Sequence, residues 1–318
     1  MTLHFSIIIP VYNRPDEIDE LLLSLTKQTY NKAFEVVVVE DGSTQKCDDI
    51  VEKYKSTLQL KYLSKPNTGA GLSRNFGMKN ANGTYFIILD SDVIVPPTYL
   101  EIVTTQLTNN YTDAFGGPDA AHSSFTDLQK AINYSMTSLL TTGGLRGNKK
   151  AKSKFQPRSF NLGLSKKAFI ATQGFAQRKI GEDIDLSFRL WEQGFETQLI
   201  SDAFVYHKRR TSLSQFFTQT YKFGKERPVL SRQYPKTAKL TYWFPSLFVL
   251  GVLVSIITAL TVCNYPLYLL GAYLFFLFID ASIRNKSIKI GALSIVTTLV
   301  QFMGYGIGFL KGFFAKTI

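Results

Sequence analysis

The sequence predicts an α/β domain followed by an all-α region of apolar helices, and three observations carry this prediction. Residues 1–110 alternate short apolar runs with segments of helical periodicity, polar residues gather where those runs end, and the last quarter of the chain is nearly free of charge. The chain has 318 residues, of which 45% are hydrophobic and 19% are charged, which excludes a disordered polar chain and a disulfide-rich miniprotein. We place the first domain at 1–210, an amphipathic basic linker at 211–239 and a transmembrane region at 240–318.

The apolar runs of the N-terminal part predict buried strands with helices between them. The candidate strands, bounded by polar residues, are 5–11, 34–39, 60–63 and 85–89. The segments with apolar residues at helical spacing are 16–29, which has acidic residues in its first turn, and 69–80. Strands that alternate with helices predict a parallel sheet covered on both faces, with ligands beyond the carboxyl ends of the strands.

The C-terminal part predicts membrane helices. No charged residue occurs over 241–279, which is long enough for two spans of about 20 residues, and 290–310 is a third uncharged stretch. We expect helices at about 242–262, 265–281 and 289–311. A buried helical core of a soluble protein is the alternative, but charge-free runs of this length are rare in soluble domains.

The basic residues of this region predict its orientation. Arg284, Lys286 and Lys289 follow the second apolar stretch, so the positive-inside rule places them in the cytoplasm. No signal peptide is recognisable around 5–10, so we expect the first domain to face the cytoplasm, in a multi-pass protein of the cytoplasmic (inner) membrane. If the third stretch also crosses, Lys311 and Lys316 lie outside, against the rule, so a re-entrant or interfacial segment stays open.

The linker at 211–239 has the pattern of a helix in the plane of lipid headgroups. Leu213, Phe216, Phe217 and Tyr221 share one helical face, and basic residues stand at both ends. An ordinary amphipathic helix packed on the first domain is the alternative. Residues 145–239 hold 20 basic and 7 acidic residues. Beside an apolar segment, this surplus favours anionic lipid or a lipid diphosphate as partner and argues against nucleic acid.

Polar side chains cluster where three of the predicted strands end. They are Asn13 and Arg14 after the first strand, 40–43 after the second, and Asp90, Ser91 and Asp92 after the fourth. Because Asp90 and Asp92 lie two residues apart, a turn between them lets both carboxylates face one divalent cation or its bound diphosphate. A simple turn or helix cap is the alternative for such a pair.

Five motifs in this order resemble those of family-2 glycosyltransferases, over about residues 4–210. They are SIIIPVYNR at 6–14, VVVEDGST at 37–44, NTGAGLSRNFG at 67–77, LDSD at 89–92 and GEDIDLSFRL at 181–190. The resemblance implies a GT-A fold, that is, a Rossmann-like mixed sheet. It also implies a nucleotide-sugar donor, a divalent metal ion (Mg²⁺ or Mn²⁺) and inversion at the anomeric carbon.

The resemblance assigns the donor pocket to residues that follow the first strands. They are Pro10, Tyr12, Arg14, Glu40, Asp41, Lys65, Asn67, Gly69 and Arg74, with Asp90 and Ser91 also near the donor. Glu40 stands where the family commonly has Asp, which keeps the charge but lengthens the side chain, so Asp41 is the firmer candidate. Gly69 permits close backbone approach, and Arg74 offers its guanidinium fork to the donor or else lies on a solvated helix face.

The resemblance also assigns the metal ligands, the base and the acceptor side. Asp92 and Asp90 would hold the metal, with His207 as a further ligand or merely a hydrogen-bonded histidine. Asp183 is the candidate general base with Glu182 as its supporting neighbour, unless these acids only stabilise a helix N-terminus. On the acceptor side we place Asn161, for which a structural turn is the alternative, together with Lys225 and Arg227.

These observations predict a membrane-anchored inverting glycosyltransferase. It would move a sugar from a nucleotide diphosphate to a hydroxyl of a lipid-linked (polyprenyl diphosphate) saccharide, in surface polysaccharide or glycan synthesis. A polyprenyl-phosphate sugar synthase is the nearest alternative. A sugar-nucleotide sensor or membrane scaffold is the non-enzymatic one.

Overall fold

The computed structural model describes residues 3–143, 154–178 and 180–315. The chain divides into two compact units. The sheet unit comprises residues 1–122 and 149–208, and the helical unit comprises residues 123–148 and 209–318. The segment 123–143, which the sequence places inside the first domain, therefore folds with the C-terminal helices.

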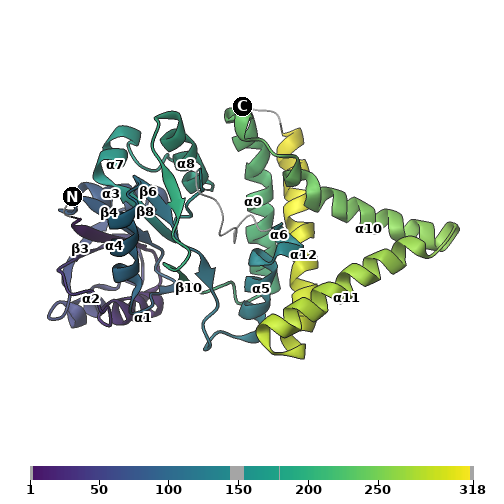
Figure 1. Cartoon of the computed structure of the whole chain (residues 1–318), viewed down its shortest axis with the longest axis horizontal. Coiled ribbons are helices and arrows are strands. Elements are labelled where there is room, and N and C mark those ends of the chain that lie inside the picture. Colours follow the sequence, from purple (N-terminus) through teal and green to yellow (C-terminus); the bar gives the residue numbers. More distant parts are fainter. Residues whose placement is uncertain (1–2, 144–153, 179, 316–318) are drawn as a thin grey trace. The chain divides into compact units, whose positions relative to one another are not determined.

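A seven-stranded mixed sheet, in the order β3-β2-β1-β4-β8-β6-β9, is the centre of the sheet unit (Figure 1). Its strands are β1 (Phe5–Val11), β2 (Glu35–Asp41), β3 (Gln59–Lys65), β4 (Tyr85–Leu89), β6 (Ala114–Gly116), β8 (Asn161–Ser165) and β9 (Thr197–Leu199). The four strands predicted from the sequence are parallel, as expected. The sheet becomes mixed because β8 runs antiparallel to both β4 and β6. The predicted fold class is confirmed.

Helices cover both faces of this sheet because its central strands are apolar on both sides. Ile7 and Ile9 pack toward one face and Ile8 toward the other. The first face is covered by α1 (Pro15–Leu25), α2 (Asp48–Tyr54) and α4 (Tyr99–Asn109). The second face is covered by α3 (Ala70–Lys79), α7 (Lys166–Thr172) and α8 (Glu182–Glu192).

A small second sheet lies beside the ends of these strands and positions the site. It consists of β5 (Val93–Ile94), β10 (Val205–His207) and β7 (Asp119–Ala120), in the order β5-β10-β7. Its register pairs His207 with Val93, the residue after Asp92, and pairs Val205 with Asp119. Three segments far apart in the sequence are thus brought together.

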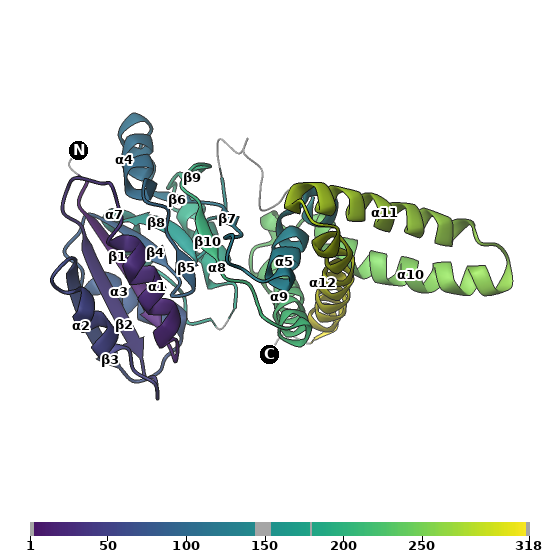
Figure 2. The same ribbon diagram turned by 90° about the horizontal axis from the view of Figure 1, so that it is seen from below.

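The helical unit is built around its last helix, α12. Its elements are α5 (Asp127–Thr137), α6 (Leu139–Thr142), α9 (Leu213–Gln233), two 3₁₀ turns at Pro235–Thr237 and Leu240–Trp243, α10 (Phe244–Thr261), α11 (Tyr265–Asn285) and α12 (Ile288–Phe314). The three helices expected at 240–318 are confirmed to within a few residues. Each is long and apolar enough to cross a membrane. Figure 2 shows α10 and α11 as a pair of helices joined by a short turn.

Glycines allow α9 and α12 to pack backbone against backbone. A Cβ atom placed on Gly308 or Gly312 of α12 would lie 2.1 Å from the carbonyl oxygen of Tyr221 or Lys225 of α9, and one placed on Gly224 would lie 2.1 Å from the carbonyl oxygen of Tyr305. Small residues four apart are the pattern that permits such close helix pairs. The GxxxG spacing of α12 therefore specifies its partner.

Part of the apolar face of α9 packs against other helices of this unit. Phe216, which the sequence analysis placed on a lipid-facing stripe, is fully buried in a cluster with Ile132 and Met136 of α5. Val300 of α12 packs against the same cluster. Helix α9 thus packs on its own unit through this residue, because α5 and α12 supply an apolar surface that sequence periodicity does not reveal.

Candidate active site

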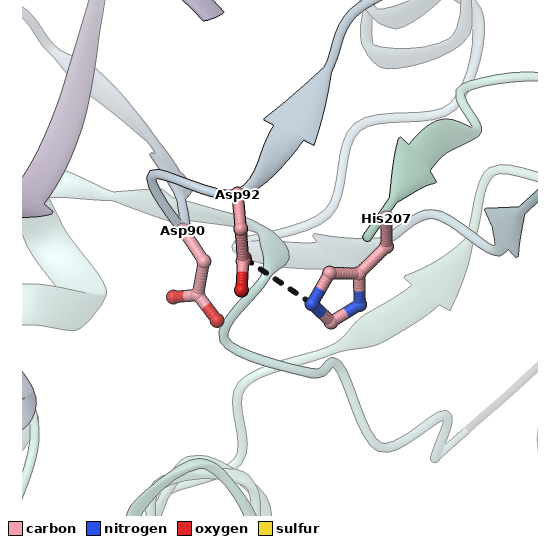
Figure 3. Close-up of side chains that lie close together, drawn as sticks. All are labelled: Asp90, Asp92 and His207. Atoms are coloured by element: carbon pink, nitrogen blue, oxygen red, sulfur yellow. Dashed lines mark ion pairs between the residues drawn. The ribbon is translucent and has the colours of Figure 1, made fainter. Parts of the chain in front are cut away.

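Two carboxylates and one imidazole converge at the end of β4. Asp90 and Asp92 come from the turn after β4, and His207 comes from β10 (Figure 3). Ligand atoms of the three side chains lie within 4.8 Å of one another. The Nε2 atom of His207 is 3.3 Å from Oδ1 of Asp92. Oxygen and imidazole donors that converge in this way suit Mg²⁺ or Mn²⁺. The residues expected to bind a metal thus lie together and fit such an ion.

Residues around this cluster orient its members. Arg14, at the start of α1, donates from Nη1 to Oδ2 of Asp92 at 2.7 Å. The ring of Phe160 stacks on His207 with centroids 4.7 Å apart. Oδ2 of the buried Asp119 lies 4.0 Å from the other ring nitrogen of His207, Nδ1. Asp119 and Phe160 could not be predicted from the sequence, because only the pairing of β10 with β7 and the packing beside it bring them to His207.

Arg74 links this cluster to the acidic motif at the start of α8. Its side chain is 3% exposed. Nη2 donates to Oδ1 of Asp90 at 2.6 Å, and Nη1 donates to Oε1 of Glu182 at 3.0 Å. Burial alone would lower the pKa of Arg74, but Asp90 and Glu182 raise it above its usual value. The Arg74 guanidinium is thus neither solvated nor free to face a donor with its whole fork, because two protein carboxylates occupy it.

Glu182 and Asp183 open α8 after Gly181, whose φ of 75° makes the turn into the helix. Burial raises the pKa of Glu182 despite the nearby charge of Arg74, and Asp183 adds to the rise. Oδ1 of Asp183 accepts from the backbone N–H of Ile184 at 2.8 Å, and Oδ2 lies 3.7 Å from Nη1 of Arg158. Asp183 is thus held as a candidate proton acceptor, and Glu182 is tied to Arg74.

Asp41 organises the loop between β3 and α3. Its carboxylate accepts hydrogen bonds from Lys65 and from the backbone N–H groups of Thr68 and Gly69, the latter two at 2.9 Å. Asn67 donates to the backbone carbonyl of Asp41 at 2.9 Å. Burial would raise the pKa of Asp41, but the hydrogen bonds from Lys65 and Thr68 hold it below its usual value. Four residues assigned to the donor pocket, Asp41, Lys65, Asn67 and Gly69, are therefore linked by hydrogen bonds to Asp41.

Glu40 does not face this loop. Its side chain is fully buried and accepts hydrogen bonds from Ser43, from the backbone N–H of Cys47 at 2.9 Å and from the Tyr62 hydroxyl at 3.2 Å. The longer side chain turns into the structure beneath the loop after β2. Its role is to brace that loop, which corrects the expectation of a donor contact.

The remaining donor candidates occupy the same ends of the strands. Pro10 lies near the end of β1, Tyr12 directly after it is 51% exposed, and Ser91 is buried between the two aspartates. The exposed ring of Tyr12 offers a flat surface for a nucleobase. Their contacts with a donor stay predictions.

Asn161 lies in the core of the sheet unit. Its side chain is fully buried, accepts from the Tyr99 hydroxyl at 2.6 Å and donates to the Ala203 carbonyl at 2.8 Å. Both polar groups of the amide are therefore used inside the protein. This corrects the expectation of an acceptor contact in favour of the structural alternative. Lys225 and Arg227 belong to the helical unit, where the Arg227 guanidinium lies 4.4 Å from the ring centroid of Tyr242, and their role toward an acceptor stays a prediction.

Replacing Asn161 with Ala is expected to destabilise the protein without weakening acceptor binding. The substitution leaves the Tyr99 hydroxyl and the Ala203 carbonyl without partners, at about 1–3 kcal/mol for each buried group. Thermal unfolding of the purified full chain measures the loss, with Asn109→Ala, at an exposed position ending α4, as the matched control. An unchanged melting temperature together with a raised KM for the acceptor would restore the acceptor role.

Comparison with known proteins agrees with this geometry. The sequence model described as "Glycosyl transferase family 2" matches residues 6–179, and that of "Glycosyl transferase family group 2" matches residues 157–280. The poly(ribitol-phosphate) beta-N-acetylglucosaminyltransferase TarS of Staphylococcus aureus is 40% identical over 112 residues, which are 34% of this chain and 20% of TarS. Chondroitin synthase of Escherichia coli is 26% identical over 235 residues, which are 64% of this chain and 34% of the synthase. The chain thus spans a fifth to a third of the length of these relatives.

Solved structures share the fold. TarS 1–349 of S. aureus in complex with UDP-GlcNAc aligns with a TM-score of 0.52 and 20% identity, over 94% of this chain and 90% of that one. The mannosyltransferase PcManGT of Pyrobaculum calidifontis, in complex with GDP-Man and Mn²⁺, aligns with a TM-score of 0.61 and 16% identity, over 99% and 88% of the two chains. At these identities the likeness concerns the GT-A fold alone. The family match covers more than half of the chain, and the chain belongs to glycosyl transferase family 2.

Proposed function

We propose that this protein transfers a sugar, with inversion, from a nucleotide diphosphate to a hydroxyl group of a lipid-linked saccharide at the cytoplasmic face of a membrane. The product would serve surface polysaccharide or glycan synthesis, as the names of TarS and chondroitin synthase suggest for those relatives. One observation carries the proposal. Arg74 joins the Asp90–Asp92–His207 cluster to the Glu182–Asp183 motif, so a site for the leaving diphosphate and a candidate base are built as one connected structure.

The residues of this site fit the two demands of the reaction. A divalent ion bound by Asp90, Asp92 and His207 would supply positive charge for the departing diphosphate. Asp183 would take the proton of the acceptor hydroxyl as its oxygen bonds to the anomeric carbon, while the bond from that carbon to the diphosphate oxygen breaks and its electron pair leaves with the nucleoside diphosphate. The ordered loop around Asp41 would bind the nucleoside.

The donor would be a sugar nucleotide, and two are the first to test. TarS 1–349 binds UDP-GlcNAc and PcManGT binds GDP-Man with Mn²⁺. The sequence of TarS is 40% identical to this chain over 112 residues, and this likeness favours UDP-GlcNAc as the donor. The lipid-linked acceptor and the membrane attachment rest on the three apolar helices and on the basic linker.

Replacing Asp92 with Ala is expected to abolish metal-dependent release of nucleoside diphosphate. The purified full chain is incubated with Mn²⁺, UDP-GlcNAc or GDP-Man and a bacterial lipid extract, and nucleoside diphosphate is measured. A loss of about 10²-fold or more is expected, because without Asp92 the metal ion that would stabilise the negative charge of the departing diphosphate is bound poorly. Asp49→Ala, at an exposed position on α2, is the matched control.

Chelation separates the possible outcomes of this experiment. EDTA should stop release by the unaltered protein, and added Mn²⁺ should restore it. Release that persists both in EDTA and in Asp92→Ala would contradict the metal role. Binding of a sugar nucleotide without release would favour the sensor, and neither release nor binding would favour the scaffold.

A further inference from the structure

The three apolar helices of the helical unit differ in how much of their surface the protein covers. In the most apolar 18-residue window of each, 6% of residues are buried for 240–261 and 11% for Tyr265–Asn285. For Ile288–Phe314 the share is 44%. The first two helices expose large apolar side chains on most sides, among them Leu250, Ile257 and Phe276. Helix α12 is a packed helix, although its hydropathy is similar.

Polar and charged helices cover α12. Ser135 of α5 lies 2.6 Å from the hydroxyl of Thr297, and Lys289 pairs with Asp127 of α5 at 2.8 Å. Along its C-terminal half α12 packs against α9 through Gly304, Gly308 and Gly312. Helix α9 carries five charged residues in this stretch, Lys222, Lys225, Glu226, Arg227 and Arg232. If α12 crossed the bilayer, α9 and α5 would have to enter the hydrocarbon with it, which charged side chains strongly oppose.

The two ends of α12 pack on the two bases of the α10–α11 hairpin. Trp243, just before α10, contacts Phe309 and Phe313 near the end of α12, with ring centroids 4.9 and 4.8 Å apart. A Cβ atom on Gly291, near the start of α12, would meet the Ser282 hydroxyl, near the end of α11, at 1.9 Å. In Figure 1, α10 and α11 diverge from opposite ends of α12 and meet at their far tip. Because a hairpin that crosses a bilayer has both bases on one side, both ends of α12 lie on that side.

We propose that, of the three apolar helices among the described residues, α10 and α11 cross the membrane as a hairpin, whereas α12 stays with α9 and α5 on the side from which the hairpin enters. The helices of the hairpin have 18 and 21 residues, or about 27 and 31 Å at 1.5 Å per residue, which matches a hydrocarbon core of about 30 Å. Aromatic side chains mark both interfaces. Tyr242 and Trp243 stand at the base, and Tyr265 and Tyr268 near the tip, where they are 74% and 67% exposed.

Cysteine labelling tests this topology, and the chain supplies one probe itself. Cys263 lies in the turn between α10 and α11, whereas Cys47 is fully buried and burial raises the pKa of its thiol, so it stays unreactive in the folded protein. A second probe is Ala315→Cys, directly after α12, and a third is Gln106→Cys on the exposed side of α4. The second and third are made in a Cys263→Ser background. All are treated with a membrane-impermeant maleimide in right-side-out and inside-out vesicles of the expression host.

We expect Cys263 to react from one side and both introduced cysteines to react from the other. If position 315 reacts from the same side as Cys263, α12 crosses the bilayer and the proposal is wrong. If Cys263 reacts from the side of position 106, the hairpin does not cross and the proposal is equally wrong. Labelling after solubilisation in detergent confirms that each thiol is present and reactive.

The inference rests on the membrane attachment in the proposed function but not on the reaction. A protein that shows the expected labelling but releases no nucleoside diphosphate would lose the proposed activity and keep the topology. A protein that is active but labels as three spans would lose the topology alone.

Discussion

Replacing Asp183 with Asn is expected to lower sugar transfer by about 10²–10⁴-fold, the usual contribution of a general base. The amide has nearly the same shape as the carboxylate but does not accept the proton of the acceptor hydroxyl. Donor affinity should change little, because the base acts on the acceptor. Transfer is measured with the donor identified in the release assay, and donor affinity by titration of the same protein.

The control for this experiment stands on the same helix. Glu192→Gln makes the matched change at an exposed position ending α8 and should leave transfer unchanged. Full transfer by Asp183→Asn would refute the role of Asp183 and would favour the polyprenyl-phosphate synthase, whose phosphate acceptor needs no strong base. Loss of donor affinity would instead indicate damage to the nucleotide pocket.

Replacing Arg74 with Met is expected to lower both stability and activity. The substitution removes the only cation shown between Asp90 and Glu182 among the described residues and leaves Glu182 largely buried, a change that costs about 3–5 kcal/mol in comparable buried pairs. Transfer should fall by about 10–100-fold even where the protein stays folded, as is usual when a residue that orients metal ligands is lost. Thermal unfolding and transfer assays measure the two effects separately.

Two further variants test whether Arg74 acts by joining two carboxylates. Arg74→Lys keeps the charge but lacks the planar fork, so we expect its stability and its transfer rate to lie between those of Arg74→Met and those of the unaltered protein. Without Arg74, the carboxylates of Asp90 and Glu182 repel each other. The double variant Arg74→Met with Glu182→Gln removes one of these charges, so we expect it to regain part of the lost stability. Strictly additive losses would show that the two residues do not act as a pair.

Much of the sheet unit follows from local sequence. The apolar runs at 5–11 and 85–89 must be buried on both faces, which requires a central parallel sheet, and the polar residues that follow such strands must meet at one edge. The grouping of Asp90 with Asp92 could thus be predicted from the residues, whereas the proposed role of Asp183 rests on a family resemblance. The antiparallel strand β8 could not be predicted from periodicity, because LGL at 162–164 alternates too briefly.

The misassigned residues share one cause. Glu40 and Asn161 both stand in motifs that suggest ligand contact, yet each is buried with its polar atoms hydrogen-bonded inside the protein. The partners of Glu40 include Cys47 and Tyr62, and those of Asn161 are Tyr99 and Ala203. A motif predicts where a residue lies on the backbone, but the direction of its side chain depends on neighbours that are brought together only in the folded chain. The same applies to Arg74, whose two carboxylate partners lie 16 and 108 residues away.

The sequence by itself determined the elements, the chemistry available at the edge of the sheet and the presence of three apolar helices. These depend on composition and periodicity within short windows, where hydrophobic burial and backbone geometry act locally. Only the tertiary structure decided which polar groups are hydrogen-bonded in the core. It also decided that α5 folds with the C-terminal helices, and that charged helices cover α12 but not α10 and α11. Hydropathy shows whether a single helix is apolar enough to cross a membrane, whereas the helices that pack on it decide whether its surface is free to contact lipid.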